Sequence, residues 1–501
     1  MNKLAIKEIS KYLGNIIEND SKVSGISYNS QEVNPGDIFV CLVGEKTDGH
    51  KFAQEAISKG AKLIVAQRKI DTSVPVIYVD DTQIALAKLA HYFYGEPSKK
   101  IKIIGVTGTN GKTTTTHLIQ HIFERNNLNT AVIGTLGTRE TTESNYYEAK
   151  HTTPQSSDLQ RQLVHLVDKK VSHLAMEVSS HALSLHRADL CNFKGAVLTN
   201  ITQDHLDFHL TMEAYANAKK KLFEMVNSSF WEKKYAVINK DDETYEQFAK
   251  IPDKSVRLFS YGINHKSDFH ASEIIFGESG LQFKLSAPIG NFIVKSKLNG
   301  LFNIYNLLAS IAVSYAEEIN LENILSTVES AKEVPGRFQI IHQGEKPLCI
   351  VDYAHTPDGL ENILRAARQM LKNSGKLICV FGCGGDRDPT KRPKMGRIAE
   401  ELSDFVVITS DNPRSEDPNQ IISDILSGIK NISSILVEVD RKNAINAAIQ
   451  KAKENDIVVV AGKGHEDYQI LKDKTIHFDD REEVTKLLQA RQGGRSSPDR
   501  S

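Results

Sequence analysis

The sequence predicts an α/β fold divided into three domains. The chain has 501 residues, and at the usual domain size this length corresponds to about three domains. Short apolar runs alternate with helical patterns along most of the chain, which is typical of parallel sheets covered by helices. In residues 101–123 an apolar run, a glycine-rich turn and a helical pattern follow one another. Phosphate-binding loops occur in this context, so we expect a nucleotide site there.

Composition excludes several classes of protein. Hydrophobic residues make up 40% of the chain, charged residues 25%, and the formal net charge is −1. These values are ordinary for a soluble globular protein, and bulk charge gives no support for a nucleic-acid partner. No apolar run approaches the ~20 residues that cross a bilayer, and the N-terminus lacks a signal-peptide pattern. The five cysteines form no C-x-x-C pair, as expected of reduced thiols. We therefore expect a cytoplasmic protein without a membrane or nucleic-acid partner, and we expect a monomer.

Residues 1–98 are predicted to form a small N-terminal α/β domain. Its strands are expected at 37–43, 62–66 and 75–79, and its helices at 51–59 and 82–93. A polar loop, residues 44–50, follows the first of these strands, and loops at strand ends often bind ligands. Residues 95–100 read as a linker to the next domain.

Residues 99–332 are predicted to form a central parallel-sheet domain around the phosphate-binding loop. The loop would let backbone N–H groups converge on phosphate oxygens at the start of a helix. Lys112 would reach the β- and γ-phosphates, and the Thr113 hydroxyl would hold Mg²⁺. Val106 stands where the usual motif has its first glycine, and a glycine occurs at Gly108 instead. The residues expected to bind ATP here are Gly108, Thr109, Asn110, Gly111, Lys112, Thr113 and Thr114.

Polar residues follow the other predicted strands of the central domain. These strands are expected at 130–133, 173–178, 195–201 and 234–238. Glu177 and His205 lie at the ends of two that we predict to be neighbours, where Mg²⁺ ligands would be useful. Lys219 lies on a predicted helix, 211–225, on the same face as Tyr215. By charge pattern alone, residues 219–221 would be a solvated run of lysines.

Residues 333–491 are predicted to form a Rossmann-like, doubly wound domain. Its strands are expected at 348–353, 376–381, 405–409, 435–439 and 457–461. Polar or glycine-rich segments follow three of them, at 382–387, 411–414 and 462–466. An Asp, an Arg and a Glu meeting at one sheet edge would suit a zwitterionic amino acid. Residues 492–501 are low in complexity, and we expect a disordered tail.

Five motifs occur in the order found in the Mur ligases, the ATP-dependent amino-acid ligases of peptidoglycan synthesis. They are Gly108–Thr113, Glu177–His181, Asn200–Asp207, Asn303-x-x-Asn306 and Asp352–Pro357. The resemblance extends from about residue 25 to residue 485. It implies a UDP-substrate-binding N-terminal domain, a central ATP-binding domain and a C-terminal domain that binds the incoming amino acid. It also implies a role in cell-wall biogenesis, and through it in cell shape and cell division.

The resemblance implies a reaction and its participants. The enzyme would add an amino acid to the D-glutamate γ-carboxylate of UDP-N-acetylmuramoyl-L-alanyl-D-glutamate through an acyl phosphate. ATP would be the co-substrate and Mg²⁺ the metal. Lys112, Glu177, His205 and Lys219 would be catalytic, with Lys219 carbamylated so that it can bind the metal beside Thr113, Glu177 and His205. Further contacts to the nucleotide would come from Asn303, Arg337 and Asp352.

Two groups of residues would bind the UDP-linked substrate. Ser30 and the 44–50 loop would hold the uridine end. This chain has Asn29-Ser30-Gln31 where relatives often have Asp-Ser-Arg, so a contact made by that arginine would be missing. The muramoyl-dipeptide would meet Thr152, Thr153, Ser179 and Arg187, together with Lys219.

The incoming amino acid would bind to the C-terminal domain. The segment Asp411-Asn412-Pro413-Arg414 resembles the signature of family members that select meso-diaminopimelate, and Arg387, Gly462 and Glu466 match the same site. Arg414 would bind the distal carboxylate, which lysine lacks. We therefore expect meso-diaminopimelate, with L-lysine or another diamino acid as the alternative. Because ATP and the amino acid would bind to different domains, we expect an open form that closes over its substrates.

Other functions are compatible with parts of the sequence. Asn239-Lys240-Asp241-Asp242 follows a strand and fits the base-reading motif of GTPases, so a nucleotide-dependent switch is an alternative; no Asp-x-x-G motif accompanies it. A folylpolyglutamate synthetase-like ligase is a second alternative, disfavoured by the N-terminal domain and residues 411–414. A degenerate member kept for scaffolding is a third, disfavoured by the intact Lys112, Glu177 and His205.

Overall fold

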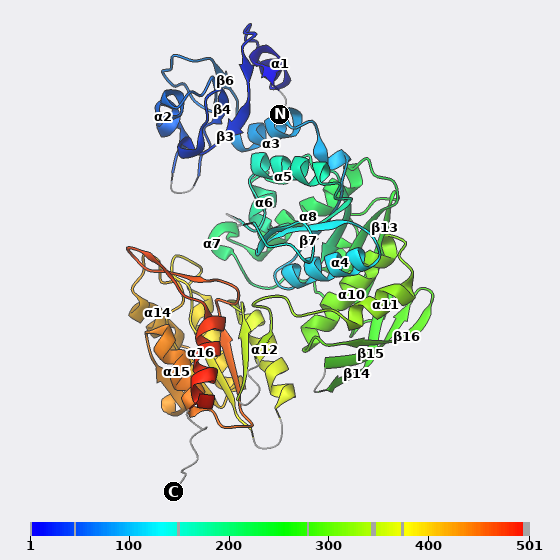
Figure 1. Ribbon diagram of the computed structural model, residues 1–501, viewed down its shortest axis with the longest axis vertical. Helices are drawn as coiled ribbons and strands as arrows, with labels where there is room; N and C mark the ends of the chain where they lie inside the picture. The colour runs from blue at the N-terminus through cyan, green and yellow to red at the C-terminus, as the bar shows by residue number, and fades with distance from the viewer. Residues whose placement is uncertain are drawn as a thin grey trace.

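The computed structural model describes residues 3–44, 47–147, 151–277, 280–341, 347–371 and 375–493. Three α/β units follow one another along the longest axis of the molecule (Figure 1). Each is built on its own main sheet, which confirms the predicted three-domain α/β fold. None of the helices in these ranges is long and apolar enough to cross a membrane.

The N-terminal unit contains a parallel sheet of four strands in the order β3-β4-β5-β6. Its strands are β1 (Leu4–Ala5), β2 (Lys22–Val23), β3 (Gly25–Ser27), β4 (Asp37–Val40), β5 (Leu63–Ala66) and β6 (Val76–Tyr78). Its helices are α1 (Ile6–Tyr12), α2 (Ala53–Ser58) and α3 (Thr82–Phe93). The Asp81 side chain caps α3 by accepting hydrogen bonds from the Gln83 and Ile84 backbone N–H groups. Apolar cores fill both faces of the sheet.

The central unit contains a ten-stranded sheet with β7 (Lys102–Thr107) between β10 (His173–Glu177) and β11 (Phe193–Leu198). The strands that carry Glu177 and the His205 loop were predicted to be neighbours, and this was wrong: β7 separates them. β7 is buried at the centre of the sheet, so its phosphate-binding loop opens between the two polar strand ends. Helices α4 (Lys112–Arg125) and α10 (Leu301–Ala316) share a core on one face, and α5 (Ser156–Asp168) and α8 (Met212–Ser228) pack on the other.

The remaining elements of this unit complete its edges. They are β8 (Thr130–Gly134), β9 (Gly137–Arg139), β12 (Lys234–Asn239), β13 (Val256–Gly262), β14 (Phe269–Gly277), β15 (Gly280–Ala287), β16 (Gly290–Ser296), α6 (Ser180–Ser184), α7 (Leu206–His209), α9 (Tyr245–Phe248) and α11 (Leu321–Glu329). Strands β14, β15 and β16 pair antiparallel and extend the sheet at one edge. They were not predicted.

The C-terminal unit contains a six-stranded sheet in the order β17-β18-β22-β19-β20-β21, antiparallel only at β17. Its strands are β17 (Gln339–Ile341), β18 (Leu348–Asp352), β19 (Leu377–Phe381), β20 (Phe405–Ile408), β21 (Ile435–Val437) and β22 (Ile457–Ala461), with a hairpin of β23 (Tyr468–Ile470) and β24 (Thr475–His477). Helices α12 (Pro357–Met370), α13 (Lys391–Leu402) and α14 (Pro418–Leu426) cover one face. Helices α15 (Arg441–Lys451) and α16 (Asp480–Gly493) cover the other. This is the predicted doubly wound arrangement.

The end of the chain only partly matches the predicted tail. Residues 492 and 493 belong to the last turn of α16, whereas residues 494–501 lie outside the described part of the chain. A buried ion pair between Arg441 and Asp480 at 2.7 Å ties α16 to α15. It holds together the two helices that cover one face of the C-terminal sheet.

Candidate active site

The phosphate-binding loop has the geometry that its glycines permit. Gly108 has φ 145° and Gly111 has φ 85°, a region that favours glycine. A Cβ atom on Gly108 would lie 1.9 Å from Thr199 Oγ1. The Lys112 ammonium folds back over the loop and donates to the carbonyl oxygens of Gly108 at 3.0 Å and Thr109 at 2.8 Å. Lys112 therefore lies at the mouth of the loop.

The segment after β11 braces this loop. The Thr109 N–H donates to the Asn200 carbonyl at 2.8 Å, and the Asn110 N–H donates to Asn200 Oδ1 at 2.9 Å. The Thr199 hydroxyl donates to the Asn110 carbonyl at 2.6 Å. Asn200, which opens one of the family motifs, was not predicted as a site residue. By accepting from two backbone N–H groups it holds the loop in place, a role that the sequence motif alone did not indicate.

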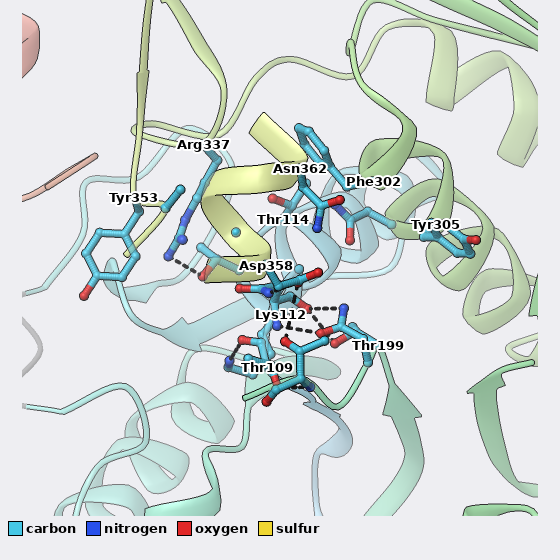
Figure 2. A pocket seen from close by; sticks show the side chains of 18 of the residues that line it. Thr109, Lys112, Thr114, Thr199, Phe302, Tyr305, Arg337, Tyr353, Asp358 and Asn362 are labelled. Carbon is cyan, nitrogen blue, oxygen red and sulfur yellow. Dashed lines mark hydrogen bonds between the residues drawn. The ribbon is translucent and has the colours of Figure 1, made fainter. Parts of the chain in front are cut away.

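A cavity of about 410 Å³ opens above the loop, between the central and C-terminal units. Figure 2 shows Thr109 and Lys112 below it, Arg337 and Tyr353 on one side, and Phe302, Tyr305 and Asn362 on the other. Its volume is in the range of small-molecule and cofactor sites. The polar loop at one end and the aromatic side chains at the other suit a nucleotide, with phosphates at the loop.

Arg337 joins the C-terminal unit to the phosphate-binding loop. Its Nη2 atom donates to Thr113 Oγ1 at 3.0 Å, and its guanidinium lies 4.5 Å from the centre of the Tyr353 ring. Its buried Nε has no hydrogen-bond partner among the described residues. Asp352 lies nearby, and its carboxylate accepts the Phe338 and Ala354 N–H groups at 2.6 and 2.7 Å. Burial raises the pKa of Asp352, although Arg337 acts in the opposite direction.

Asn303 does not lie where the motif suggested. Its Nδ2 atom donates to the Asn299 carbonyl at 2.7 Å, and its Oδ1 atom accepts from Asn306 Nδ2 at 3.1 Å. Asn306 lines the cavity, whereas Asn303 is buried behind it. Asn303 therefore orients Asn306, and Asn306 is the member of this pair that faces the proposed nucleotide.

Glu177 is fully buried at the end of β10, next to the loop. Its Oε2 atom accepts the Thr113 hydroxyl at 3.1 Å and the Thr135 hydroxyl at 3.0 Å, and its Oε1 atom accepts the Thr135 N–H at 2.9 Å. Gly134 leaves room for the carboxylate, because a Cβ atom there would lie 2.2 Å from Oε1. The structure therefore brings Glu177 and Thr113 together, as expected.

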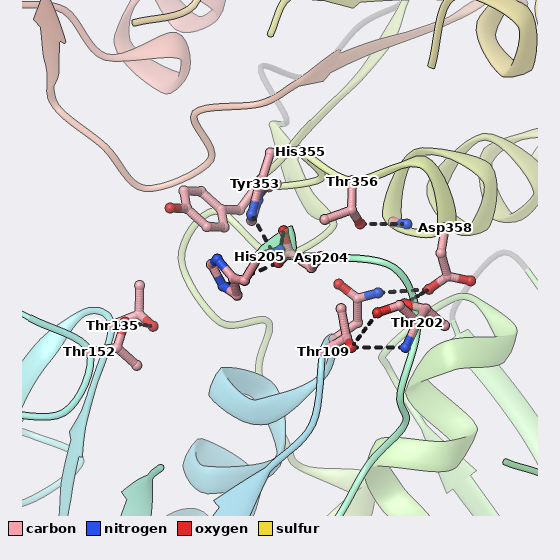
Figure 3. Close-up of polar contacts among 12 residues, drawn as sticks. Thr109, Thr135, Thr152, Thr202, Asp204, His205, Tyr353, His355, Thr356 and Asp358 are labelled. Atoms are coloured by element: carbon pink, nitrogen blue, oxygen red, sulfur yellow. Dashed lines mark hydrogen bonds and ion pairs between the residues drawn. The ribbon is translucent and has the colours of Figure 1, made fainter. Parts of the chain in front are cut away.

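His205 lies on the other side of the loop, with a left-handed backbone (φ 54°) at the start of α7. Its Nε2 atom lies 3.3 Å from Asp204 Oδ2, and His355 Nε2 lies 3.9 Å from the same oxygen. Figure 3 shows His355 of the C-terminal unit lying over this pair. Burial lowers the pKa of both histidines, to about 4 for His355. Asp204 and His355 were not predicted as site residues, although both lie within quoted motifs.

The oxygen ligands present fit Mg²⁺. Within the described residues, no group of three or more His, Cys, Asp and Glu side chains forms a metal site. Mg²⁺ does not require such a group, because it commonly takes one or two carboxylates and completes its shell with water and phosphates. Glu177 and the Thr113 hydroxyl place oxygen atoms side by side at the phosphate-binding loop. His205 would add a nitrogen ligand, which is less usual for this ion.

Lys219 of α8 is buried under the loop, with 1% of its surface exposed. Its Nζ atom donates to the Gly108 carbonyl at 2.9 Å and lies 4.5 Å from the centre of the Tyr215 ring. Burial and the nearby Lys112 ammonium lower the pKa of Lys219 well below its usual value. The run of lysines predicted a solvated side chain, and this was wrong for Lys219. Lys220 instead makes exposed hydrogen bonds to Asn217 and Gln247.

The residues predicted to bind the muramoyl-dipeptide cluster next to Glu177. The Thr153 hydroxyl donates to the Glu177 carbonyl at 2.8 Å and accepts the Ser179 N–H at 3.1 Å. Thr152 and Ser179 line the cavity. Arg187 Nη1 lies 3.4 Å from the Thr153 carbonyl, and its buried Nε has no partner among the described residues. That unpaired donor suits an anionic ligand.

The predicted uridine site lies in the N-terminal unit. The Ser30 hydroxyl donates to Glu55 Oε2 at 2.9 Å, and the neighbouring Gln31 side chain donates to Glu55 Oε1 at 3.0 Å. Within the 44–50 loop, His50 Nδ1 lies 2.6 Å from Asp48 Oδ1. Residues 45 and 46 of that loop lie outside the described part of the chain.

The residues predicted to bind the amino acid meet at the carboxyl ends of β19, β20 and β22. Asn412 Nδ2 donates to Glu466 Oε2 at 2.9 Å, and Arg414 Nη1 donates to the Gly385 carbonyl at 2.8 Å. The Asp411 carboxylate lies next to Gly462, where a Cβ atom would come within 2.6 Å of Oδ2. Pro413 contributes its backbone to the same turn, since a Cβ atom on Gly385 would lie 2.0 Å from its carbonyl oxygen.

Arg387 lies on the rim of this cluster. It is exposed, and its Nη1 atom donates to the Asp386 carbonyl at 3.1 Å. A Cβ atom on Gly384 would contact both Arg414 Nη1, at 2.9 Å, and Arg387 Cγ, at 3.9 Å. The two arginines therefore flank the same glycine turn, and Arg387 is free to move toward a ligand.

The GTPase-like segment 239–242 has a structural role. In an Asn-Lys-x-Asp motif the base-reading aspartate would be Asp242, and both of its carboxylate oxygens are occupied. Its Oδ2 atom accepts the Ile201 N–H at 2.7 Å, and its Oδ1 atom accepts the Thr244 N–H at 2.9 Å. Asn239 Nδ2 donates to the Thr199 carbonyl at 2.8 Å. An aspartate with all these partners is not available to read a guanine base, so the observation that favoured the switch function is explained by the fold.

Asp358 connects the two halves of the cavity and was missed from the sequence. Its Oδ2 atom accepts Asn110 Nδ2 at 2.7 Å and the Thr202 hydroxyl at 3.4 Å (Figure 3). It directly follows the motif that ends at Pro357, but nothing in its spacing indicates a contact 248 residues away. This contact links the phosphate-binding loop to the first turn of α12.

Three family models match successive parts of the chain. The "Mur ligase family, catalytic domain" matches residues 22–94, the "Mur ligase middle domain" residues 106–314, and the "Mur ligase, glutamate ligase domain" residues 336–464. Among curated proteins, the UDP-N-acetylmuramoyl-L-alanyl-D-glutamate–2,6-diaminopimelate ligase of Syntrophomonas wolfei is 46% identical over 479 residues, covering 94% of this chain and 96% of that protein. The ligase of the same name from Listeria monocytogenes is 42% identical over 495 residues, covering 98% and 99%.

Solved structures agree with these matches. A structure of a UDP-N-acetylmuramoyl-L-alanyl-D-glutamate–2,6-diaminopimelate ligase superposes with a TM-score of 0.68 at 33% identity, covering 98% of this chain and 100% of that one. The MurF ligase of Thermotoga maritima in complex with ADP shares the fold, with a TM-score of 0.65 at 21% identity and coverage of 95% and 99%. The chain therefore belongs to the Mur ligase family.

Proposed function

We propose that this chain is an ATP-dependent ligase that adds meso-diaminopimelate to UDP-N-acetylmuramoyl-L-alanyl-D-glutamate in peptidoglycan precursor synthesis. One observation carries the proposal: the phosphate-binding loop and an Arg414–Glu466 amino-acid cluster occupy the facing strand ends of two adjoining domains. The two relatives described above are named for this reaction and cover nearly the whole chain.

The reaction would proceed in two steps. An oxygen of the D-glutamate γ-carboxylate attacks the γ-phosphorus of ATP, the bond to the bridging oxygen breaks, and ADP leaves. The amine of the incoming amino acid then attacks the acyl phosphate carbon, and phosphate leaves as the amide forms. The loop N–H groups and Lys112 would position the phosphates and balance their charge. The proton lost by the amine passes to a nearby base or to water.

Mg²⁺, when bound, would neutralise charge on the ATP phosphates. Thr113, Glu177, His205 and a carbamylated Lys219 are the residues proposed to hold it. The burial and lowered pKa of Lys219 favour its neutral amine, and the neutral amine is the form that attacks CO₂ to give a carbamate and a proton. The resulting anion would lie beside the Lys112 ammonium and carry the opposite charge.

The other predicted contacts keep their proposed roles. Ser30 and the 44–50 loop would hold the uridine end, and Thr152, Thr153, Ser179 and Arg187 would hold the muramoyl-dipeptide. The unpaired buried Nε of Arg187 supports that assignment. We keep domain boundaries of 1–98, 99–332 and 333–491, which fall between the three main sheets.

Selection of meso-diaminopimelate is assigned to Arg414. Within the described residues, its Nε and Nη2 atoms have no hydrogen bond, so they are available to a carboxylate. A guanidinium binds carboxylate through two parallel hydrogen bonds, whereas L-lysine offers an ammonium group at the corresponding end. L-lysine would therefore place like charges together.

We further propose a cytoplasmic monomer. All five cysteines are buried and unpaired, as expected in a reducing compartment. Sedimentation velocity with and without substrates would test the monomer.

The proposal is tested by phosphate release with ATP, Mg²⁺ and UDP-N-acetylmuramoyl-L-alanyl-D-glutamate. Three arms receive meso-diaminopimelate, L-lysine or no amino acid, and mass spectrometry identifies the product. We expect turnover and a joined product only with meso-diaminopimelate. Turnover with L-lysine would keep the ligase and contradict the role of Arg414, and equal phosphate release without an amino acid would contradict the ligase itself.

A further inference from the structure

Lys463 is a buried lysine in the turn after β22, between two of the residues predicted to bind the amino acid. None of its side chain is exposed. Its Nζ atom donates to Glu466 Oε2 at 3.0 Å and to Asn412 Oδ1 at 3.1 Å. A buried ammonium must keep such partners, because removing a charge from water is costly unless it is paired. Lys463 therefore fixes both neighbours.

Asn412 is oriented by these contacts. Its Oδ1 atom accepts from Lys463 Nζ and from the Ile470 N–H at 2.9 Å, so its Nδ2 atom must point the other way, toward Glu466. The Asn412 carbonyl accepts the Gly385 N–H at 2.9 Å and lies 3.4 Å from Arg414 Nη1. The same residue thus connects the carboxylate-binding arginine to the acidic end of the site.

Glu466 is left with one oxygen for a ligand. Its Oε2 atom accepts from both Lys463 and Asn412, whereas its Oε1 atom has no hydrogen bond within the described part of the chain. Lys463 and Asn412 therefore hold one edge of the carboxylate and leave the other edge open. A carboxylate oxygen without another partner is what an ammonium group of an amino acid requires.

We propose that Lys463 is the positioning residue of the amino-acid site. It holds the Oε2 atom of Glu466, aims the free Oε1 atom at the ligand's ammonium group and, through Asn412, sets where that atom lies relative to Arg414. The proposal deepens the proposed function and rests on it. It assigns Lys463 no contact with the ligand, and it explains why an apolar side chain of similar length would not serve at this buried position.

The test compares Lys463→Met with the wild-type enzyme. We expect KM for meso-diaminopimelate to rise at least about tenfold, the loss expected when hydrogen bonds to a charged group are broken. KM for ATP and for the UDP-linked substrate should stay within about twofold, because neither substrate meets this turn. Lys442→Met is the matched control, since Lys442 lies in the same domain with a side chain 64% exposed.

A double-mutant cycle separates positioning from general stabilisation. Lys463→Met, Glu466→Gln and the double variant are compared by KM for meso-diaminopimelate and by melting temperature. If Lys463 acts through Glu466, the double variant should be no worse than Glu466→Gln alone. The inference would be overturned if the rises in KM of the two single variants multiplied in the double variant. It would also be overturned if Lys463→Met folded and had an unchanged KM. Turnover by the wild-type enzyme in the same assay supports the proposed function. If the wild-type enzyme shows no turnover, the proposed ligase function is contradicted, and not the positioning role of Lys463.

Discussion

The protonation of His117, a buried side chain of α4, makes the stability of the fold depend on pH. Its Nδ1 atom lies 2.7 Å from the Thr113 carbonyl, which can only accept, so Nδ1 carries the proton; Nε2 accepts from the Tyr146 hydroxyl at 2.7 Å. The neutral ring satisfies both contacts. Burial and Arg139 lower the pKa of His117 to about 3.

The sign of the resulting pH dependence follows from linkage. The unfolded chain binds a proton near the usual pKa of 6.5, whereas the folded chain does not until about pH 3, so stability is full above pH 6.5 and falls with acidification. The loss from one such group approaches about 1.4 kcal/mol per pH unit. We expect His117→Gln to reduce the drop in melting temperature between pH 7.5 and pH 5.0. The exposed His477→Gln should leave that drop unchanged, and an unchanged drop in both would contradict this explanation.

Lys219 belongs to a run of three lysines, which predicts an exposed side chain, but it is buried under the phosphate-binding loop. We expect Lys219→Met to lower kcat by about 100-fold or more, as when a group that balances transition-state charge is removed. The variant Lys220→Met, at a half-buried neighbour outside the proposed site, should stay close to wild type. Carbon-13 NMR after addition of labelled bicarbonate should show a carbamate signal in the wild-type enzyme and none in Lys219→Met. A signal absent from both proteins would contradict carbamylation.

The backbone of the turn between β7 and α4 requires glycine at position 108. Gly108→Ala would place Cβ 1.9 Å from Thr199 Oγ1 in a backbone conformation with φ 145°. We expect KM for ATP to rise at least about tenfold, since a shifted loop loses hydrogen bonds to charged phosphates. Gly277→Ala is the control, because its Cβ would meet only the Gly280 carbonyl at 3.5 Å. Normal ATP binding by Gly108→Ala would show that the loop tolerates a different shape.

Most of the parallel strands were predictable because both of their faces are buried, although the parallel strands β3 and β13 were missed. Continuous apolar runs placed β10 at residues 173–178 and β22 at 457–461, and the structure has them at His173–Glu177 and Ile457–Ala461. Strands β14 to β16 were missed because they lie on an edge with one exposed face. Their signal was alternation, as at Leu281, Phe283 and Leu285, rather than an apolar run.

Site residues that belong to a sequence motif were predictable. Residues whose place in the site is set by tertiary packing were not. Glu177 and Thr113 meet as their motifs suggested. Asn303 and Asn306 share a motif, but only the helix packing shows which of the two faces the cavity. Lys463 was not predicted as a site residue, because burial of its ammonium depends on Asn412 from a different strand end.

At the scale of the whole molecule, the C-terminal domain is joined to the phosphate-binding loop by a few polar contacts. Asp358 accepts from Asn110, and Arg337 donates to Thr113. Polar contacts of this kind allow domain motion, since large apolar interfaces are what hold domains rigidly together. In the proposed reaction the amine of the amino acid must reach the acyl phosphate formed at the loop, so the amino-acid cluster would have to approach the loop.

We therefore expect the enzyme to become more compact on binding substrates. Small-angle scattering should give a smaller radius of gyration with a non-hydrolysable ATP analogue and UDP-N-acetylmuramoyl-L-alanyl-D-glutamate than without them. Asp358→Ala, which removes the contact to Asn110, should weaken this change. An unchanged radius of gyration in the wild-type enzyme would contradict domain closure.

The acyl-phosphate reaction is the central claim, and oxygen transfer tests it most directly. The UDP-linked substrate is labelled with oxygen-18 in the D-glutamate γ-carboxylate and turned over with ATP and meso-diaminopimelate. Attack of that carboxylate on ATP moves one of its oxygen atoms into the released phosphate, so we expect one oxygen-18 per phosphate and ADP as the other product. Unlabelled phosphate, or label released in AMP, would contradict the mechanism.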